Sequence, residues 1–269
     1  MLIYLVLFSQ IINKEVSLEG ISVKYVDHFG DDFRVFEAAK ATMGGEDESG
    51  FKRGETDPTR LINFLARESH FTPMRHPNIT FECEAPIAIA RQLGKHQTGM
   101  SWNERSMRYR DSVIDIFVPD MFRGRPESLH SGSTDVDVGD YSTEVYKHIV
   151  IENEESTDYE DSRDEWVKCT ISEVFKDAID NALFSYDQLL KAGLAPEQAR
   201  FVLPQGMVTR WMWTGSLLSW FNLYKQRISH HSQYETQDFA KQLDTHMTKL
   251  FPITWEALKT YQMKSDNES

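Results

Sequence analysis

The chain has 269 residues, of which 40% are hydrophobic and 26% charged, so it is long enough to bury a full core and has the composition of a soluble globular protein. Its formal net charge is −13, but thirteen acidic residues and only two basic ones lie between Glu127 and Glu165, which leaves −2 for the rest. No basic stripe of the kind that binds a nucleic-acid polymer is visible. Clefts outside the acidic segment can still be locally positive and attract a small anion.

The chain begins with an apolar run, MLIYLVLFSQII, that is too short to span a bilayer. It lacks the basic start and the small-residue cleavage pattern of a signal peptide. We therefore expect residues 1–20 to be an N-terminal extension, either an extra strand or a loosely ordered segment, with a signal-like segment as the less favoured alternative. The remaining residues, 21–269, are predicted to form a single domain of a cytoplasmic protein that does not contact membranes.

The two cysteines are too few and too far apart in sequence for a disulfide framework or a zinc site. Cys83 lies on the apolar face of an alternating run with Ile79 and Phe81, which predicts a buried core residue. Cys169 falls off the apolar stripe of the helix expected around it, which predicts an exposed thiol. Two unpaired thiols are typical of a reducing compartment.

Hydrophobic patterns in the N-terminal half alternate between strand and helix periods. A strand followed by a polar loop is expected over 21–32, and a short helix over 33–43 ends at a Gly-Gly pair. The next expected elements are a helix over 58–67, a strand over 78–84, and a helix from Ala85 to about His96 with proline in its first turn.

The C-terminal half is predominantly helical after a compositional break. Residues 124–165 are rich in Gly, Ser, Thr and Asp, which predicts a solvated acidic insertion with one strand-like piece at 145–151. The strongest helical periodicity of the chain covers 167–190. Further helices are predicted over 196–202, 211–224 and 233–250. Together the patterns predict an α/β (α+β) fold, a mixed sheet with a helical C-terminal half.

The stretch from Ala90 to Tyr109, ARQLGKHQTGMSWNERSMRY, concentrates polar side chains directly after an apolar segment. Phosphate oxygens favour arginine, lysine and hydroxyl groups, whereas the edges of bases favour amides and guanidinium forks. The stretch therefore predicts a site that binds an anionic nucleotide together with a second polar ring system.

This stretch resembles the signature of the flavin-dependent thymidylate synthases, which is Arg-His-Arg, seven residues and Ser, within a pattern that ends Asn-Glu-x-Ser-x-Arg-Tyr. Further segments resemble the family in the same order: VDHFGDD with FEAAKATM, HFTPMRH, EQARFVLP with Thr209-Arg210, and residues 222–235. The likeness covers about 21–251, less the acidic insertion. This chain departs from the family pattern at four positions and has eight residues, not seven, before the serine. The four are Lys95 and Gln97, where the family has arginines, and Ser216 and Leu218, where it usually has Asn and Arg.

The resemblance implies a flavin-dependent thymidylate synthase-like fold and the methylation of dUMP to dTMP. Methylenetetrahydrofolate would supply the carbon, and FAD reduced by NADPH would supply the hydride, in a homotetramer that shares its active sites between subunits. Arg227 is the implied catalytic group that polarises uracil, and Ser106 positions the substrate. The implied dUMP contacts are Gln92, Lys95, Glu104, Arg105, Ser106, Met107, Arg108, Arg227 and, from another subunit, Arg200. The implied FAD contacts are Thr42, His70, Thr72, Lys95, His96, Gln97, Glu104, Ser216 and Asn222.

Two other functions remain open at this point. His70, His76 and His96 with acidic neighbours would also suit a metal-dependent nucleotide phosphohydrolase, and the altered signature would suit a non-catalytic relative that has lost flavin. The adjacent His230 and His231 do not predict a metal pair, because neighbouring residues on a helix point about 100° apart. Three tryptophans are predicted to be core residues: Trp211, Trp213 and Trp220.

Overall fold

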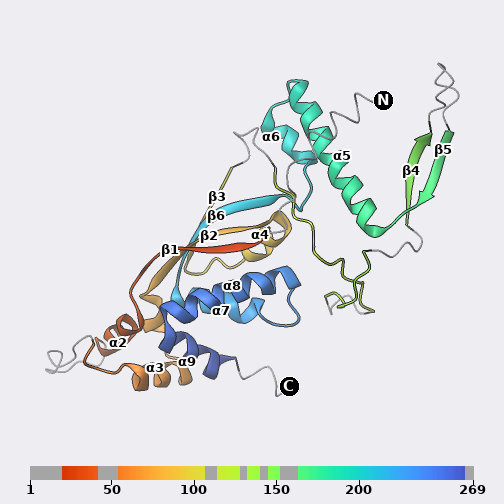
Figure 1. The fold of residues 1–269 in the computed structure, drawn as a ribbon. Helices are drawn as coiled ribbons and strands as arrows, with labels where there is room; N and C mark the ends of the chain where they lie inside the picture. The colour runs from red at the N-terminus through yellow and green to blue at the C-terminus, as the bar shows by residue number, and fades with distance from the viewer. Residues whose placement is uncertain are drawn as a thin grey trace. The chain divides into compact units, whose positions relative to one another are not determined.

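The computed structural model describes residues 20–41, 54–106, 114–127, 132–139, 145–151 and 163–263. These residues form two compact units (Figure 1). The first unit combines two separate parts of the chain, 20–105 and 208–263, and the second contains the residues between them. The proposal of one domain with an acidic insertion stays a prediction.

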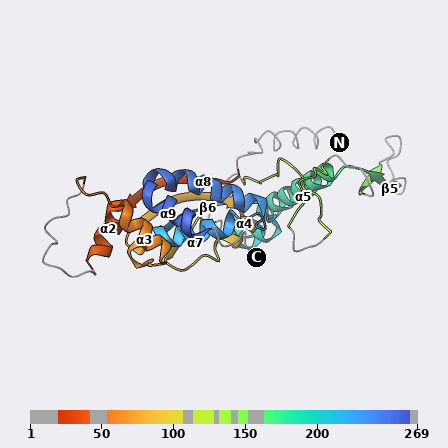
Figure 2. The ribbon, with the colours of Figure 1, turned by 90° about the horizontal axis from the view of Figure 1, so that it is seen from below.

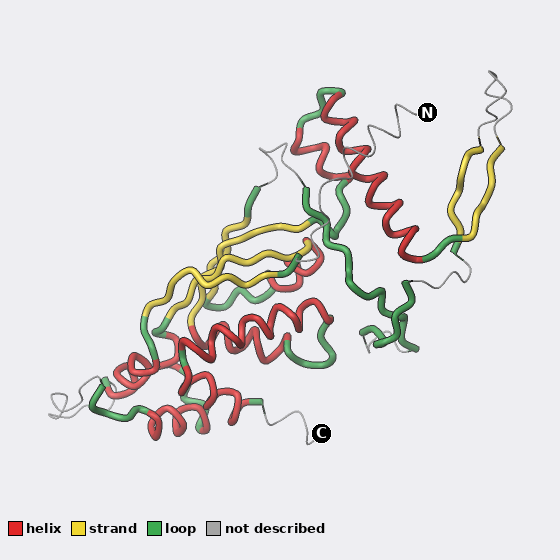
Figure 3. Tube along the Cα trace, viewed as in Figure 1, coloured by secondary structure: helices red, strands yellow, loops and turns green. Residues whose placement is uncertain are grey.

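An antiparallel sheet of four strands forms the centre of the first unit, in the order β1-β2-β6-β3 (Figure 3). The strands are β1 (Ser22–Phe29), β2 (Asn78–Pro86), β3 (Met100–Glu104) and β6 (Val208–Ser216). The predicted α+β class is confirmed. Each described pair of neighbouring strands is antiparallel. The prediction of a mixed sheet is therefore wrong.

Helices cover one face of this sheet, as Figures 1 and 2 show. Those packed near the sheet are α4 (Ile87–Leu93), α7 (Leu217–Arg227) and α8 (Tyr234–Leu250). Beyond the strand ends lie α2 (Asp32–Lys40), α3 (Thr59–Arg67), the short 3-10 helix η2 (Thr72–Arg75) and α9 (Pro252–Gln262). An antiparallel sheet with helices on a single face buries alternate side chains of each strand.

Strand β6 shows this alternation clearly. Trp211 and Trp213 are buried, whereas Met212 between them is 40% exposed on the opposite face. The Trp213 ring lies 5.0 Å from that of Trp220 on α7 and 6.2 Å from that of Phe239 on α8, measured between ring centroids. The predicted tryptophan core is therefore confirmed.

The prediction of a helix over 211–224 is wrong in its first half, because β6 continues to Ser216 and α7 begins at Leu217. The Ser216 Oγ accepts a hydrogen bond from the backbone N–H of Ser219 at 3.2 Å, which caps the first turn of α7. Strand β3 and helix α9 were not predicted either. The predicted helix from Ala85 starts later, since β2 reaches Pro86.

The second unit contains an antiparallel strand pair and a long helix. Its elements are β4 (Tyr146–Ile151), β5 (Arg163–Lys168), α5 (Ile171–Lys191), α6 (Pro196–Ala199) and the 3-10 helix η6 (Arg200–Val202). Cys169 is only 4% exposed, and its thiol donates to the Val145 carbonyl at 3.7 Å. The prediction of an exposed Cys169 is wrong because this residue precedes α5, which begins after Thr170 as its N-cap.

Asp32 joins the two helices α2 and α9. Its carboxylate accepts from the backbone N–H groups of Ile253 at 2.9 Å and Thr254 at 2.8 Å, and the residue is 8% exposed. We expect Asp32→Ala to lower the free energy of unfolding by about 1–2 kcal/mol, because it leaves two helix N-terminal donors without their acceptor. Urea unfolding followed by circular dichroism measures this. Asp27→Ala, at an exposed position of β1, is the control, and equal losses in both variants would contradict the capping role.

Candidate functional site

The polar loop that follows α4 is attached to helix α7 at both ends of that helix. Near the start of α7, the Gly99 carbonyl accepts from the Ser216 N–H at 3.3 Å. At the end of α7, the Nε of Arg227 donates to the Nε2 of His96 at 2.9 Å. Gly99 has φ +69, and a Cβ there would collide with the Ser219 hydroxyl. The close approach therefore requires glycine.

Arg227 is the last residue of α7 and is partly buried. Besides its bond to His96, its Nη2 donates to the backbone carbonyl of Gln92 at 3.4 Å. Both acceptors are uncharged, and no carboxylate in the described part of the chain pairs with this guanidinium. Burial lowers the pKa of Arg227, but a guanidinium remains cationic at neutral pH. The result is a partly buried positive charge without a counter-ion among the described residues, an arrangement that costs free energy and is typical of functional sites.

His96 is a neutral acceptor in this contact. Burial, together with the adjacent charge of Arg227, lowers the pKa of His96 to about 4. Because its Nε2 accepts the Arg227 hydrogen, the ring proton of the neutral imidazole resides on Nδ1. The imidazole therefore holds the arginine without cancelling its charge.

Gln92 carries a second acceptor, in its side chain. While its backbone carbonyl receives Arg227, its side-chain Oε1 is buried and has no hydrogen-bond partner among the described residues. A buried acceptor without a donor calls for an explanation, such as an ordered water or a functional role. By their chemistry, an amide oxygen can accept from the N–H of a planar molecule, and a guanidinium can donate to its carbonyl oxygen.

The second half of the signature lies beside β6, because β3 pairs with it. The Glu104 carboxylate accepts from the Thr209 hydroxyl at 2.7 Å and from the Trp102 indole N–H at 3.4 Å. The Arg105 N–H donates to the Arg210 carbonyl at 2.8 Å. Two segments that resemble the family, about one hundred residues apart in sequence, are thus brought into direct contact at the sheet edge.

Besides His96, the predicted cofactor contacts in this unit fall into two groups. Six are exposed polar side chains, namely His70, Thr72, Lys95, Gln97, Glu104 and Asn222. Ser216 differs, since it is buried and its hydroxyl lies 2.7 Å from that of Ser219 at the start of α7. Leu218, where the resemblance expects arginine, is 7% exposed and belongs to the hydrophobic core.

Five other predicted site residues do not belong to the described part of the first unit. Ser106 and Arg200 belong to the second unit, where the Nε of Arg200 donates to the backbone carbonyl of Glu197 at 3.2 Å. Three others lie outside the described residues: Thr42, Met107 and Arg108. The roles of all five stay predictions.

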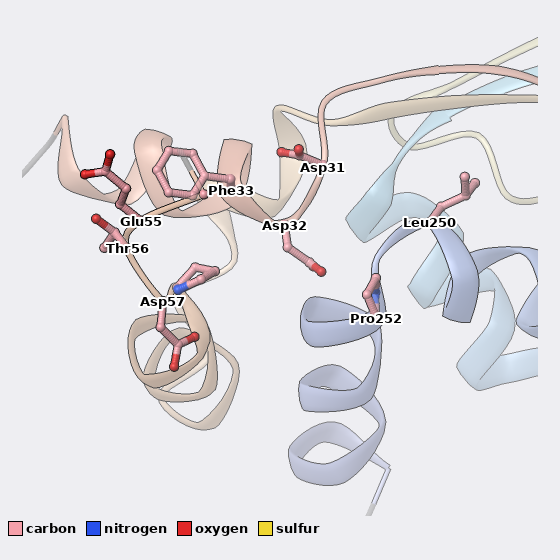
Figure 4. A pocket seen from close by; sticks show the side chains of 10 residues that line it. Asp31, Asp32, Phe33, Glu55, Thr56, Asp57, Leu250 and Pro252 are labelled. Carbon is pink, nitrogen blue, oxygen red and sulfur yellow. The ribbon is translucent and has the colours of Figure 1, made fainter. Parts of the chain in front are cut away.

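A separate pocket lies where the N-terminal ends of α2, α3 and α9 meet (Figure 4). Asp31, Asp32, Glu55 and Asp57 are among its lining residues. Three of these acids accept backbone N–H groups at the starts of helices: Asp31 accepts from Arg34, Asp57 from Thr59, and Asp32 from Thr254 of α9. Within the described ranges no group of three or more His, Cys, Asp or Glu residues is arranged to hold a metal ion. In the same ranges no helix is both long and apolar enough to cross a membrane.

Comparison with known proteins points to one family. The family described as "Thymidylate synthase complementing protein" matches residues 24–253. A flavin-dependent thymidylate synthase of Thermosipho africanus is 30% identical over 244 residues, which are 91% of this chain and 93% of the relative. One of Streptomyces avermitilis is 28% identical over 250 residues, covering 89% of this chain and 91% of the relative.

A solved structure agrees with these sequence relatives. The crystal structure of a UMP/dUMP methylase from Streptomyces cacaoi, bound with 5-Br dUMP, has 26% sequence identity and a TM-score of 0.68. The match covers 90% of this chain and 95% of that one. The predicted family is confirmed: the chain is an enzyme of the thymidylate synthase complementing protein family, the flavin-dependent thymidylate synthases.

Proposed function

We propose that the protein methylates dUMP to dTMP, with methylenetetrahydrofolate as carbon donor and with FAD that NADPH reduces. The observation that supports this most is the Arg227 guanidinium, which pairs with no described carboxylate. It is held by the backbone carbonyl of Gln92, whose side-chain Oε1 has no hydrogen-bond partner among the described residues. The methylase from Streptomyces cacaoi was crystallised with 5-Br dUMP and with 5-Br UMP, whose rings carry an imide edge. An imide offers the N–H and the carbonyl oxygen that this pair of residues can receive.

In this reaction Arg227 stabilises negative charge on a uracil carbonyl oxygen. Charge drawn onto the oxygen makes the ring a better carbon nucleophile, and the stabilisation grows as the transition state is approached. Because His96 and the Gln92 carbonyl already hold the guanidinium, little reorganisation is required when the substrate binds. The Gln92 Oε1 would accept from the ring N–H and fix the ring in its plane.

The donor set of the unit fits an anionic cofactor that carries ring systems. Lys95 offers an ammonium group for a phosphate oxygen, Gln97 and Asn222 offer amides, and Thr72 offers a hydroxyl, all of them exposed. The 3-10 helix η2 packs against α7, so Thr72 and Asn222 come from adjoining elements. When bound, reduced flavin would supply the hydride, and these residues would hold the flavin.

We further propose that copies of the chain associate as a homotetramer. The 21-residue helix α5 is amphipathic, yet Tyr186 is its only residue that is buried in the single chain. In the same unit, Phe184 is 40% exposed and Phe201 79% exposed. Clustered exposed apolar side chains are typical of a surface covered by a protein partner. Analytical ultracentrifugation should give four chains per particle, and a monomer at all concentrations would contradict the proposal. A cytoplasmic location stays a prediction.

The absorbance spectrum of the purified protein is the direct test of the proposed function. We expect a flavin band at about 450 nm that NADPH bleaches, and dTMP formation when dUMP and methylenetetrahydrofolate are added. Bound manganese or zinc without flavin would favour the phosphohydrolase instead. A protein that binds dUMP but neither flavin nor folate would be a non-catalytic relative.

We expect dTMP formation without a covalent cysteine intermediate. Burial raises the pKa of the Cys83 thiol well above its ordinary value, and Cys169 is buried in the other unit, so neither suits an activated thiolate. The double variant Cys83→Ala, Cys169→Ala should retain turnover within a few-fold. Steady-state dTMP formation, with flavin content and circular dichroism as controls of integrity, measures this. Loss of all turnover in a folded, flavin-loaded double variant would overturn the expectation.

A further inference from the structure

We propose that His96 is a positioning residue that orients Arg227 for the substrate ring, in addition to the flavin contact that the resemblance implies. The inference rests on the proposed function, because it assumes that Arg227 acts on the nucleotide. Its structural basis is the hydrogen bond from the Arg227 Nε to the His96 Nε2 at 2.9 Å, across 131 positions of sequence.

The two acceptors of Arg227 leave one edge of its guanidinium unoccupied. A guanidinium has five N–H groups in a planar fork, and the Nε and Nη2 groups share one edge of that plane. His96 and the Gln92 carbonyl receive this edge, at 2.9 Å and 3.4 Å respectively. No described residue engages the Nη1 end. The His96 contact therefore determines which way the reactive end of the side chain faces.

His96 is itself held in place by the backbone. Its N–H donates to the Leu93 carbonyl at 3.0 Å in the turn that ends α4, and the loop beyond it is attached to α7 through Gly99. Arg227 has a long flexible side chain at the end of its helix, and ordering such a side chain costs conformational entropy. An acceptor fixed before the substrate arrives removes part of that cost from the binding step.

An uncharged imidazole suits this position better than a carboxylate would. A carboxylate would bind Arg227 more strongly, but its negative charge would offset the positive charge that Arg227 presents to the ring. An imidazole accepts the same hydrogen and leaves the charge intact. Substitutions at His96 can therefore separate the acceptor function from the charge.

The test compares His96→Gln, His96→Glu and His96→Ala in the flavin-loaded protein. The amide oxygen of glutamine can accept from Arg227 without charge, so His96→Gln should retain most dTMP formation. His96→Ala should lower kcat for dTMP by on the order of ten- to a hundredfold, because a misoriented catalytic group costs this much. His96→Glu should be as poor as His96→Ala, although it can hold the arginine. If glutamate matched the wild type, or glutamine were as poor as alanine, the positioning role would be wrong.

A double-mutant cycle with Arg227 gives a readout that does not depend on turnover. The dissociation constant of dUMP is measured by calorimetry on the oxidised holoenzyme. It should rise in His96→Ala and in Arg227→Ala. In the double variant it should be almost the same as in Arg227→Ala alone. Additive losses would show that His96 acts independently of Arg227, and would overturn the inference. A wild-type protein that neither binds dUMP nor forms dTMP would instead overturn the proposed function itself.

Discussion

Arg227→Ala is expected to lower dTMP formation by on the order of a hundredfold or more, the typical cost of removing one preorganised group that stabilises charge in the transition state. The expectation follows from a cation that is partly buried, unpaired with any described carboxylate, and held by His96 and Gln92. Flavin should remain bound, and oxidation of NADPH by the flavin should continue, because Arg227 is assigned to the nucleotide. Separate assays of dTMP formation and of flavin reduction measure the two half-reactions.

Two further variants define what Arg227 contributes. Arg227→Lys should restore little activity, since an ammonium group is a point charge that lacks the planar fork needed to contact His96, Gln92 and the ring at once. Arg67→Ala is the matched control, because Arg67 is an exposed arginine at the end of α3 that pairs with its neighbour Glu68. Its turnover should equal that of the wild type. Near-normal dTMP formation by Arg227→Ala would show that Arg227 is an ordinary residue at a helix end, without a catalytic role.

Trp213→Ala is expected to lower the free energy of unfolding by about 3–5 kcal/mol, the usual range when a buried aromatic side chain is removed from a packed core. The side chain has no exposed surface and lies in β6, between strands on both sides. Its ring centroid is 4.8 Å from that of Trp102 and 5.0 Å from that of Trp220, so its loss leaves a cavity within rigid aromatic neighbours.

The adjacent residue supplies a control for this experiment. Met212→Ala changes an exposed side chain on the other face of the same strand and should alter stability by less than about 0.5 kcal/mol. Trp213→Phe should cost less than alanine, partly because the Trp213 indole N–H is buried without a partner among the described residues and its removal relieves that cost. Urea unfolding at a fixed protein concentration measures all three variants. Equal stability of Trp213→Ala and Met212→Ala would show that β6 is not central to the core.

Several features of the protein followed from the sequence by itself because they depend on local patterns or on whole motifs. The apolar stripe over 167–190 predicted a long helix, which α5 confirms from Ile171 onward, although residues 167–168 belong to β5. Strict alternation around Cys83 predicted a buried thiol in β2, which is also confirmed. The ordered motifs pointed to the family, which the match over residues 24–253 confirms. These signals are strong because a long helical period or a set of correctly spaced motifs rarely arises by chance.

The segment from Trp211 to Ser216 shows where local patterns are not sufficient. WMWTGS is short and aromatic, and such a run can be part of a strand or of a helix. Its buried side chains do recur with period two, a signal that could have revealed the strand. The choice is made by β2 and β3, which provide backbone hydrogen bonds on both sides of β6 from a part of the chain more than a hundred residues earlier.

The sequence by itself determined the family, the principal helices and the polar residues from which a site could be built. Only the tertiary structure decided which of these residues meet. The hydrogen bond of His96 to Arg227 and the unpartnered oxygen of Gln92 depend on the end of α4 lying beside the end of α7. The hydrophobic periodicity of a segment does not predict such a contact. The contact forms only when two segments that are distant in sequence pack on the same face of the sheet.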